Sequence, residues 1–263
     1  MVKNKQDLCR LVIVLLMGVF MLAGCGAKED ISLDRVKEVG EISFAMSGGY
    51  PPFNYYDETN QLVGFDVDVC KEVATRLGVE FVPVTTDFSG LTEGLRAGVY
   101  DGILGSMAIT EERLKVVDFT IPYYYSGAQL LVKKGSEFTQ PQDLKGKVVG
   151  VATGTTFEKD AEGLDVADVR LYKDDNQTLM ELGNGVIDGV ITDRVVGVNA
   201  INTGKFEVEL LGAPLRSEDI AVAFRKEDKT LKEAVNEIIQ EMHEDGTLSG
   251  LSEKWLQVDI TQK

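Results

Sequence analysis

A ten-residue segment occurs twice in this chain, and the repeat limits the folds that the chain can adopt. Residues 95–104 read L-R-A-G-V-Y-D-G-I-L, and residues 182–191 read L-G-N-G-V-I-D-G-V-I, with five of the ten positions identical. Each copy ends a helical segment, turns at Gly-Val-x-Asp-Gly and enters a short apolar run, which is the step from helix to strand in a βαβ unit. The repeat therefore predicts two similar α/β lobes.

The two copies diverge directly after the repeat, where the ligands of open parallel sheets bind. The first copy continues through Gly105 and Ser106 to Arg113, whereas the second continues to Asp193. One lobe would then offer a positive charge and the other a negative charge. Opposite charges that face each other across a cleft favour a zwitterionic ligand. The aspartates of the repeated turn, Asp101 and Asp188, are expected to have structural roles instead.

The first 24 residues have the composition of an export signal. Three basic residues precede an apolar run at residues 11–22, which is shorter than the roughly 20 residues of a membrane-spanning helix. We therefore expect residues 1–24 to be a cleaved signal peptide. Residues 25–40 are polar and charged, and we interpret them as a tether.

The end of this signal, Leu22-Ala23-Gly24-Cys25, resembles the lipobox of bacterial lipoproteins. The resemblance implies cleavage before Cys25 and attachment of a lipid to its thiol. The protein would then be anchored to the outer face of the cell membrane, or lie in the periplasm if the envelope has two membranes. An ordinary signal with an incidental cysteine is the alternative. Cys70 is left without a disulfide partner and is expected in the core.

The charge of the chain restricts its partners. It has 27 basic and 43 acidic residues and a formal net charge of −16, and loss of residues 1–24 would make it more negative. Such a surface disfavours binding to nucleic acid and to anionic lipid headgroups. The chain has one histidine, no cysteine pair suited to zinc, and no phosphate-loop lysine in the segment 150–156. We expect no cofactor, no metal and no catalytic triad, and we expect a monomer.

Hydrophobic periodicity and turn residues divide the remaining chain into two βαβαβ lobes. In the first, strands are expected at 41–47, 79–85 and 101–107, and helices at 64–77, 88–97 and 110–117. In the second, strands are expected at 147–152, 169–172 and 189–192, and helices at 155–162, 177–184 and 194–201. An extended aromatic segment, 119–132, and a run at 220–225 would cross between the lobes. The helical tail 230–256 is expected to pack on the first lobe.

Seven motifs along the chain stand in the order found in the extracellular solute-binding proteins of polar amino acid transporters, family 3. They are Tyr50-Pro51-Pro52-Phe53, Gly64-Phe65-Asp66-Val67-Asp68-Val69, Phe88-Ser89-Gly90-Leu91, Ala108-Ile109-Thr110-Glu111-Glu112-Arg113, Asp118-Phe119-Thr120-x-Pro122-Tyr123-Tyr124, Gly150-Val151-x-x-Gly154-Thr155-Thr156 and Asp188-Gly189-x-x-x-Asp193. Because the resemblance extends from Glu41 to Leu256, it is specific.

This resemblance implies an α/β fold of the periplasmic-binding-protein type, in which two βαβ lobes joined by two crossing strands close like a venus flytrap. Lobe one would comprise residues 41–126 and 223–263, and lobe two residues 127–222. The implied function is to bind a free amino acid outside the cytoplasm and to deliver it to the permease and ATPase of an ABC importer.

The resemblance also implies how the backbone of the ligand is held. Arg113 presents a planar fork suited to an α-carboxylate, and the backbone N–H groups of Ala108 and Thr156 would complete that site. Asp193 would accept the α-ammonium. The alternatives are a surface ion pair for Arg113 and a helix N-cap for Asp193, and the cap could coexist with binding.

Further residues are expected to line the cleft. Tyr50 and Phe88 are expected in its wall, and Phe157 could lie in the wall or in the core. The remaining candidates are small or hydroxyl-bearing: Ser47, Gly105, Ser106, Ala152 and Thr155. Ser47 stands where basic-amino-acid and glutamine binders often have an aspartate. With no fixed charge expected around the ligand side chain, the sequence favours an uncharged amino acid.

Two other functions stay open. Some relatives with this fold are dehydratases, and such an enzyme needs a general acid in the cleft. No second acid beside Asp193 can be assigned from the sequence, so Glu158 is the residue to examine. A ligand-sensing module is the third possibility. Binding without catalysis is the favoured interpretation.

Overall fold

The structure, a computed structural model, describes residues 30–263. The predicted signal peptide, residues 1–24, and the predicted lipid-bearing Cys25 lie outside this range. Within it, no helix is both long and apolar enough to span a bilayer. The predicted tether was wrong over Ser32–Val39, because these residues form helix α2 and bury Val36 in the core.

The repeated turn makes the same hydrogen bonds in both lobes. Asp101 donates its N–H to the Ser43 carbonyl at 3.0 Å, and its Oδ2 accepts from the Ser43 N–H at 2.8 Å. Asp188 donates to the Val148 carbonyl at 2.8 Å, and its Oδ2 accepts from the Val148 N–H at 2.9 Å. Each aspartate thus ties its turn to the neighbouring parallel strand. The predicted structural role of both residues is confirmed.

Lobe one is built around short parallel strands with helices beside them. Its strands are β1 (Glu41–Met46), β5 (Glu80–Thr85) and β6 (Gly102–Ile103), with a small separate sheet of β2 (Gly49–Tyr50), β3 (Asn54–Tyr56) and β4 (Leu62–Val63). Its helices are α3 (Phe65–Leu77), η1 (Phe88–Gly90), α4 (Leu91–Arg96), α5 (Glu111–Leu114), α9 (Lys229–Glu244) and α10 (Thr247–Leu256). The tail helices α9 and α10 pack against α3, as predicted.

Helix α3 shows why the periodicity of the sequence was informative. Phe65, Val69 and Val73 recur every four residues and are fully buried. Cys70 is also fully buried, and its thiol is free, as expected for a core residue. Gly78 ends the helix at φ 76°, a left-handed conformation that glycine adopts without steric cost.

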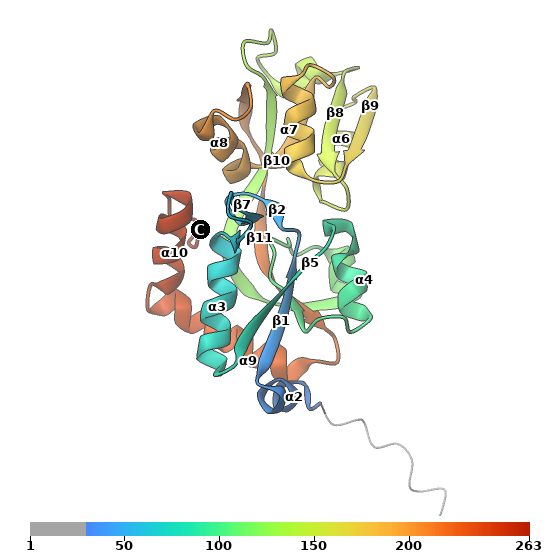
Figure 1. Ribbon diagram of the computed structural model, residues 1–263. Helices are drawn as coiled ribbons and strands as arrows, with labels where there is room; N and C mark the ends of the chain where they lie inside the picture. Colours follow the sequence, from blue (N-terminus) through green and yellow to red (C-terminus); the bar gives the residue numbers. More distant parts are fainter. Residues whose placement is uncertain (1–29) are drawn as a thin grey trace, which may run out of the picture.

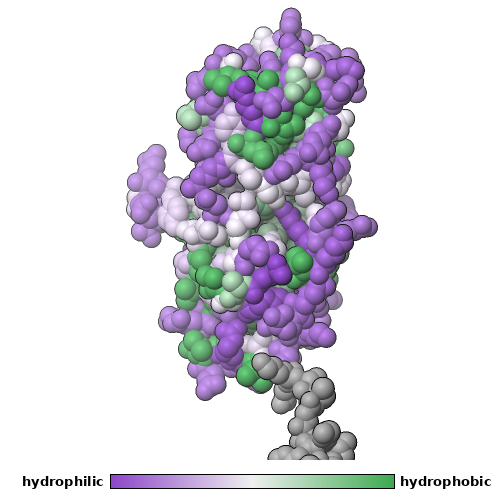
Figure 2. Space-filling view, turned by 90° about the vertical axis from the view of Figure 1, so that its right-hand side faces the viewer, coloured by the Kyte–Doolittle hydropathy of each residue, from purple (hydrophilic) through white to green (hydrophobic). Residues whose placement is uncertain are grey.

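Lobe two repeats this arrangement. Its strands are β8 (Val148–Ala152), β9 (Asp168–Tyr172) and β10 (Gly189–Asp193), and its helices are η2 (Pro141–Leu144), α6 (Phe157–Glu162), α7 (Asp175–Gly183) and α8 (Arg194–Thr203). Strand β9 is the last strand of the sheet. Figure 2 shows a largely hydrophilic face on which apolar residues gather most densely over lobe two.

Two long antiparallel strands join the lobes. They are β7 (Val117–Lys133) and β11 (Val208–Arg225), the latter an irregular strand that is longer than the expected run at 220–225. They lie in the middle of one eight-stranded sheet, in the order β5-β1-β6-β11-β7-β10-β8-β9. In lobe one β11 pairs with β6 at Ala223, and in lobe two β7 pairs with β10 over Ala128–Val132. The crossing is visible in Figure 1 and confirms the predicted two-lobed fold.

Candidate functional site

A cavity lies between the lobes, and residues of both lobes line it. The structure brings all eleven predicted ligand-site residues to it: Ser47, Tyr50, Phe88, Gly105, Ser106, Ala108, Arg113, Ala152, Thr155, Thr156 and Asp193. Eight further residues line it: Gly49, Tyr124, Phe157, Lys173, Asp174, Asp175, Glu218 and Ile220. Glu158 is not among the lining residues, and its Oε1 accepts from the Gly154 N–H at 2.6 Å.

Arg113 reaches the cavity from the short helix α5. Thr110 caps this helix, because its Oγ1 accepts from the Arg113 N–H at 3.1 Å. The guanidinium donates from Nη1 to the Ala108 carbonyl at 2.7 Å and from Nη2 to the Gly154 carbonyl, in lobe two, at 3.1 Å. Its carbon lies 5.6 Å from the centre of the Phe88 ring. The alternative of a surface ion pair is therefore wrong: both protein acceptors are carbonyl oxygens.

Arg113 remains positively charged although it is buried. Burial lowers the pKa of the guanidinium, and the negative charge of Glu218 opposes this shift. Since the ordinary pKa of arginine is above 12, the group remains positive at neutral pH. A guanidinium has five N–H donors, so the two bonds to carbonyl oxygens leave donors for an anion in the cavity.

Ala108 and Thr156, whose N–H groups are expected to bind the carboxylate, both line the cavity. Ala108 lies opposite Ile220 in an isolated β bridge whose hydrogen bonds are made by flanking residues. The N–H and C=O of Ala108 itself therefore turn away from the bridge. Thr156 directly precedes α6, and its hydroxyl donates to Glu218 Oε1 at 2.5 Å.

Asp193 ends β10 and also caps the next helix. Its Oδ1 accepts from the Val195 N–H at 2.7 Å, so the predicted N-cap of α8 is confirmed. Its carboxylate lines the cavity while the residue is only 2% exposed. Burial, the largest influence, raises the pKa of Asp193 to about 7. A cation in the cavity would stabilise its ionised form.

Stacked aromatic rings form one wall of the cavity. Phe53 lies between Tyr50 and Tyr124, with ring centres 5.5 Å and 5.0 Å away and interplanar angles of 22° and 15°. Tyr124 was missed by sequence analysis, which interpreted its segment only as a crossing strand. Phe157 both lines the cavity and belongs to the core of lobe two, so its two predicted roles coexist.

A buried hydrogen-bond network holds Ser106 in place. Asp66 Oδ2 accepts from the Ser106 hydroxyl at 2.8 Å and from the Asn54 amide at 2.7 Å, while Oδ1 accepts from the Tyr123 hydroxyl at 2.7 Å. Tyr123 in turn accepts from the Ser106 N–H at 3.1 Å. These bonds fix Ser106 at φ 60°, a strained conformation for a residue other than glycine. Asp66 thus positions a cavity residue and does not itself line the cavity.

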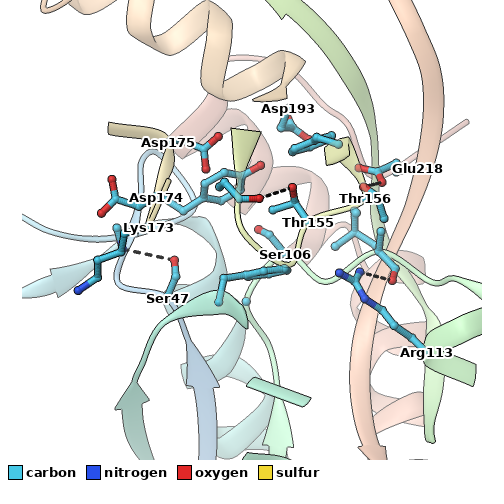
Figure 3. Close-up of a pocket in the computed structure, with 18 of the residues that line it drawn as sticks. Ser47, Ser106, Arg113, Thr155, Thr156, Lys173, Asp174, Asp175, Asp193 and Glu218 are labelled. Carbon is cyan, nitrogen blue, oxygen red and sulfur yellow. Dashed lines mark hydrogen bonds between the residues drawn. The ribbon is translucent and has the colours of Figure 1, made fainter. Parts of the chain in front are cut away.

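The cavity is lined by charged residues that the sequence analysis did not assign to it. Lys173, Asp174 and Asp175 follow strand β9 and line the cavity on the side away from Arg113, as Figure 3 shows. Glu218, from the irregular part of β11, is a further buried acid and pairs with Arg216 at 2.8 Å. The expectation that the cleft lacks a second acid was therefore wrong.

The two lobes contact each other around the cavity, so the structure describes a closed form. Lys159 pairs with Glu112 and Lys173 with Asp87, each at 3.1 Å. Asn176 Nδ2 donates to a backbone carbonyl of lobe one at 3.2 Å. With the bond from Arg113 to lobe two, these contacts enclose the site.

Comparison with known proteins agrees with this architecture. Residues 42–258 match the family described as bacterial extracellular solute-binding proteins, family 3. The L-cystine-binding protein TcyJ of Escherichia coli (strain K12) is 36% identical over 252 residues, which cover 94% of this chain and 95% of that protein.

Solved structures are similar over most of the chain. A mutant of ArgBP from T. maritima has a TM-score of 0.82 at 35% identity and covers 86% of this chain and 100% of its own. An ancestral amino acid-binding protein, described as a precursor of cyclohexadienyl dehydratase, has a TM-score of 0.81 at 32% identity, with 86% and 99% covered. This chain belongs to the bacterial extracellular solute-binding proteins, family 3.

Proposed function

We propose that this protein binds one free amino acid between its lobes and delivers it to the permease and ATPase of an ABC importer. The observation that carries the proposal is the placement of Arg113 and Asp193, from different lobes, in one enclosed cavity. The relatives support it, since TcyJ is named for binding L-cystine and ArgBP has been solved in an arginine-bound form.

In this mode of binding, the α-carboxylate of the ligand lies against Arg113, with the Ala108 and Thr156 N–H groups as further donors. Charge-assisted hydrogen bonds of this kind contribute about 1.5–3 kcal/mol each. The α-ammonium contacts Asp193. Because the two charges belong to opposite lobes, one ligand joins both, and hinge motion at β7 and β11 couples binding to closure.

The site of action follows from the N-terminus. An export signal over residues 1–24 and lipidation at Cys25 would place the domain outside the membrane, next to the permease. Cleavage before Cys25 would be detected by mass spectrometry of the mature protein. Loss of membrane association in a Cys25→Ala variant would support the anchor.

Isothermal titration calorimetry with a panel of amino acids, including cystine, tests the binding function. At least one amino acid should bind, and Arg113→Ala should weaken its binding about 100-fold or more, because two charge-assisted bonds are lost. Arg96→Ala is the matched control, since Arg96 is exposed and pairs with Glu93 outside the cavity. The proposal is wrong if no amino acid binds, or if Arg113→Ala binds as tightly as Arg96→Ala.

The dehydratase alternative is not favoured. Although the structure adds buried acids to the cavity, the curated relatives are named as binding proteins. Incubation with prephenate or arogenate should give no product. Turnover that depends on Asp175 or Glu218 would overturn this conclusion.

A further inference from the structure

One end of the cavity carries acidic groups that contact with the amino acid backbone does not use. Asp175 is the first residue of α7 and is 4% exposed, yet it lines the cavity. Its Oδ1 is buried without a hydrogen-bond partner among residues 30–263. Asp174 lines the same end, and its Oδ1 accepts from the Gln177 N–H at 2.9 Å. Figure 3 shows both carboxylates across the cavity from Arg113.

A buried carboxylate oxygen without a hydrogen-bond partner is unfavourable, because the charge has lost its hydration. Burial raises the pKa of Asp175 to about 6 against the lowering effect of the Thr192 hydroxyl, and the neighbouring charge of Asp174 adds to the rise. This end of the cavity therefore offers acceptors and negative charge to a ligand.

We propose that Asp174 and Asp175 form a cation subsite, and that the ligand is an amino acid whose side chain ends in a positively charged group. The proposal rests on the function proposed above, because it assumes that the α-carboxylate lies at Arg113. It replaces the earlier preference for an uncharged ligand. Ser47 contributes no charge, so in this chain the negative charge comes from lobe two.

A ligand with a side-chain cation would contact both lobes, through its α-carboxylate in lobe one and through this cation in lobe two. With the α-carboxylate at Arg113 in lobe one, the side chain extends past the aromatic wall toward α7 in lobe two. Lys173 lines the cavity beside the aspartates and pairs with Asp87 at 3.1 Å across the lobes. A second α-amino acid group, as in cystine, could place its ammonium at Asp175 and its carboxylate near Lys173. Arginine and lysine would use the aspartates alone.

Matched ligand pairs test the subsite by calorimetry on the wild-type protein. Two pairs, arginine with citrulline and lysine with norleucine, differ in the distal cation. The third, cystine with S-methylthiocysteine, differs in the whole second amino acid group. At least one cationic ligand should bind about tenfold or more tightly than its neutral counterpart. If every neutral ligand binds as tightly as its cationic counterpart, the cation subsite is wrong.

Variants of the two aspartates test whether these residues cause the preference for the cationic ligand over its neutral counterpart. Asp175→Asn should reduce the preference for the cationic ligand to about that of its neutral counterpart. Asp174→Asn keeps an N-cap side chain on α7 and should reduce the preference in part. Asp168→Asn, an exposed β9 control outside the cavity, should leave it unchanged. Circular dichroism verifies folding; if Asp175→Asn does not fold, the result with Asp174→Asn decides.

The outcomes separate this inference from the function on which it rests. Suppose that neutral amino acids bind as tightly as cationic ones and that Arg113→Ala weakens their binding. The cation subsite is then wrong, but the proposed binding function is supported. If no member of any pair binds, the proposed function itself fails. An unchanged cation preference in both aspartate variants also overturns the subsite.

Discussion

Asp193 illustrates how one residue combines a structural and a functional role. Its Oδ1 caps α8 through the Val195 N–H, while its buried carboxylate has a pKa raised to about 7. In the ligand-free protein, a pKa above the ordinary value of 3.8 means that the stabilising contribution of the protonated form is complete below about pH 4 and lost as the pH rises through about 7. A ligand ammonium reverses this preference, because it stabilises the ionised carboxylate.

We therefore expect ligand affinity to rise with pH between about 5 and about 7. Below the pKa of Asp193, the affinity should fall about tenfold per pH unit, because the carboxylate must lose a proton to accept the ammonium. Titrations near pH 6 in buffers of different ionisation enthalpy should show proton release on binding.

Asp193→Asn is the test variant, because asparagine caps a helix as well as aspartate does. It should retain the fold, bind more weakly and lose the pH dependence near 7. Asp175, with a pKa of about 6, adds a second and lower step for a cationic ligand, so a neutral ligand isolates the effect of Asp193. The assignment to Asp193 is wrong if Asp193→Asn keeps the same dependence.

At the scale of elements, the repeated turn connects the sequence to the sheet. In both lobes the aspartate of Gly-Val-x-Asp-Gly bonds to the backbone of the first strand, but Asp101 makes more bonds than Asp188. Its carboxylate also accepts from the Ser43 hydroxyl and from Arg35, each at 2.7 Å. Burial raises the pKa of Asp101, but these bonds outweigh it and leave the pKa lowered.

Replacement of these aspartates should destabilise the protein unequally. Asp188→Ala should lower the free energy of unfolding by about 1–3 kcal/mol, and Asp101→Ala by more, because more charged hydrogen bonds are lost. Urea unfolding of the ligand-free variants measures both. The control is Glu237→Ala, on the exposed side of α9, which should change the free energy of unfolding by less than about 0.5 kcal/mol. Equal effects of all three replacements would contradict a structural role for the repeat.

The sequence predicted this scaffold well because its signals are local. Apolar residues at helical spacing marked α3, and the repeated turn marked the entry into β6 and β10. The predicted cavity residues follow strand ends, so their place in an α/β sheet is determined by connectivity. Asp174 and Asp175 fall between the expected strand 169–172 and the expected helix 177–184, and the sequence analysis assigned them no role. Their position across the cavity from Arg113 depends on how the lobes close, which local spacing does not encode.

The irregular strand β11 presents the same difficulty. Glu218 lies between two shifts of register, one between Leu211 and Arg216 and the next between Ile220 and Ala221. Because each shift changes which side chains face the cavity, alternation along the sequence could not assign Glu218 to it. Tyr124 lies in the partner strand β7, opposite Ile220 and next to the same register shift. Alternation along the sequence therefore could not assign its side chain to the cavity, although the motif that contains Tyr124 was recognised.

For the whole molecule, the contact between the lobes determines function. Gly154 in lobe two packs against Ser89 in lobe one, and a Cβ added at Gly154 would lie 2.9 Å from the Ser89 Cα. Its carbonyl also accepts from Arg113. The two lobes approach here as closely as a glycine permits, so this position controls closure without contributing a side chain to the ligand site.

Gly154→Ala should therefore hinder closure. Gly135→Ala is the matched control, since both glycines have positive φ, 81° and 75°, but a Cβ at Gly135 meets nothing within 4 Å. Both replacements should lower stability by about 1 kcal/mol through backbone strain. Only Gly154→Ala should weaken ligand binding, by about tenfold or more, because the closed form is the one that contacts both ends of the ligand.

Small-angle X-ray scattering distinguishes a closure defect from a local one. Saturating ligand should reduce the radius of gyration of the wild type and of Gly135→Ala, whereas Gly154→Ala should remain more open at the same occupancy. Arg113 is unchanged in this variant, so the donor for the ligand carboxylate is still present. If Gly154→Ala binds and compacts like the control, the contact between Gly154 and Ser89 does not control closure.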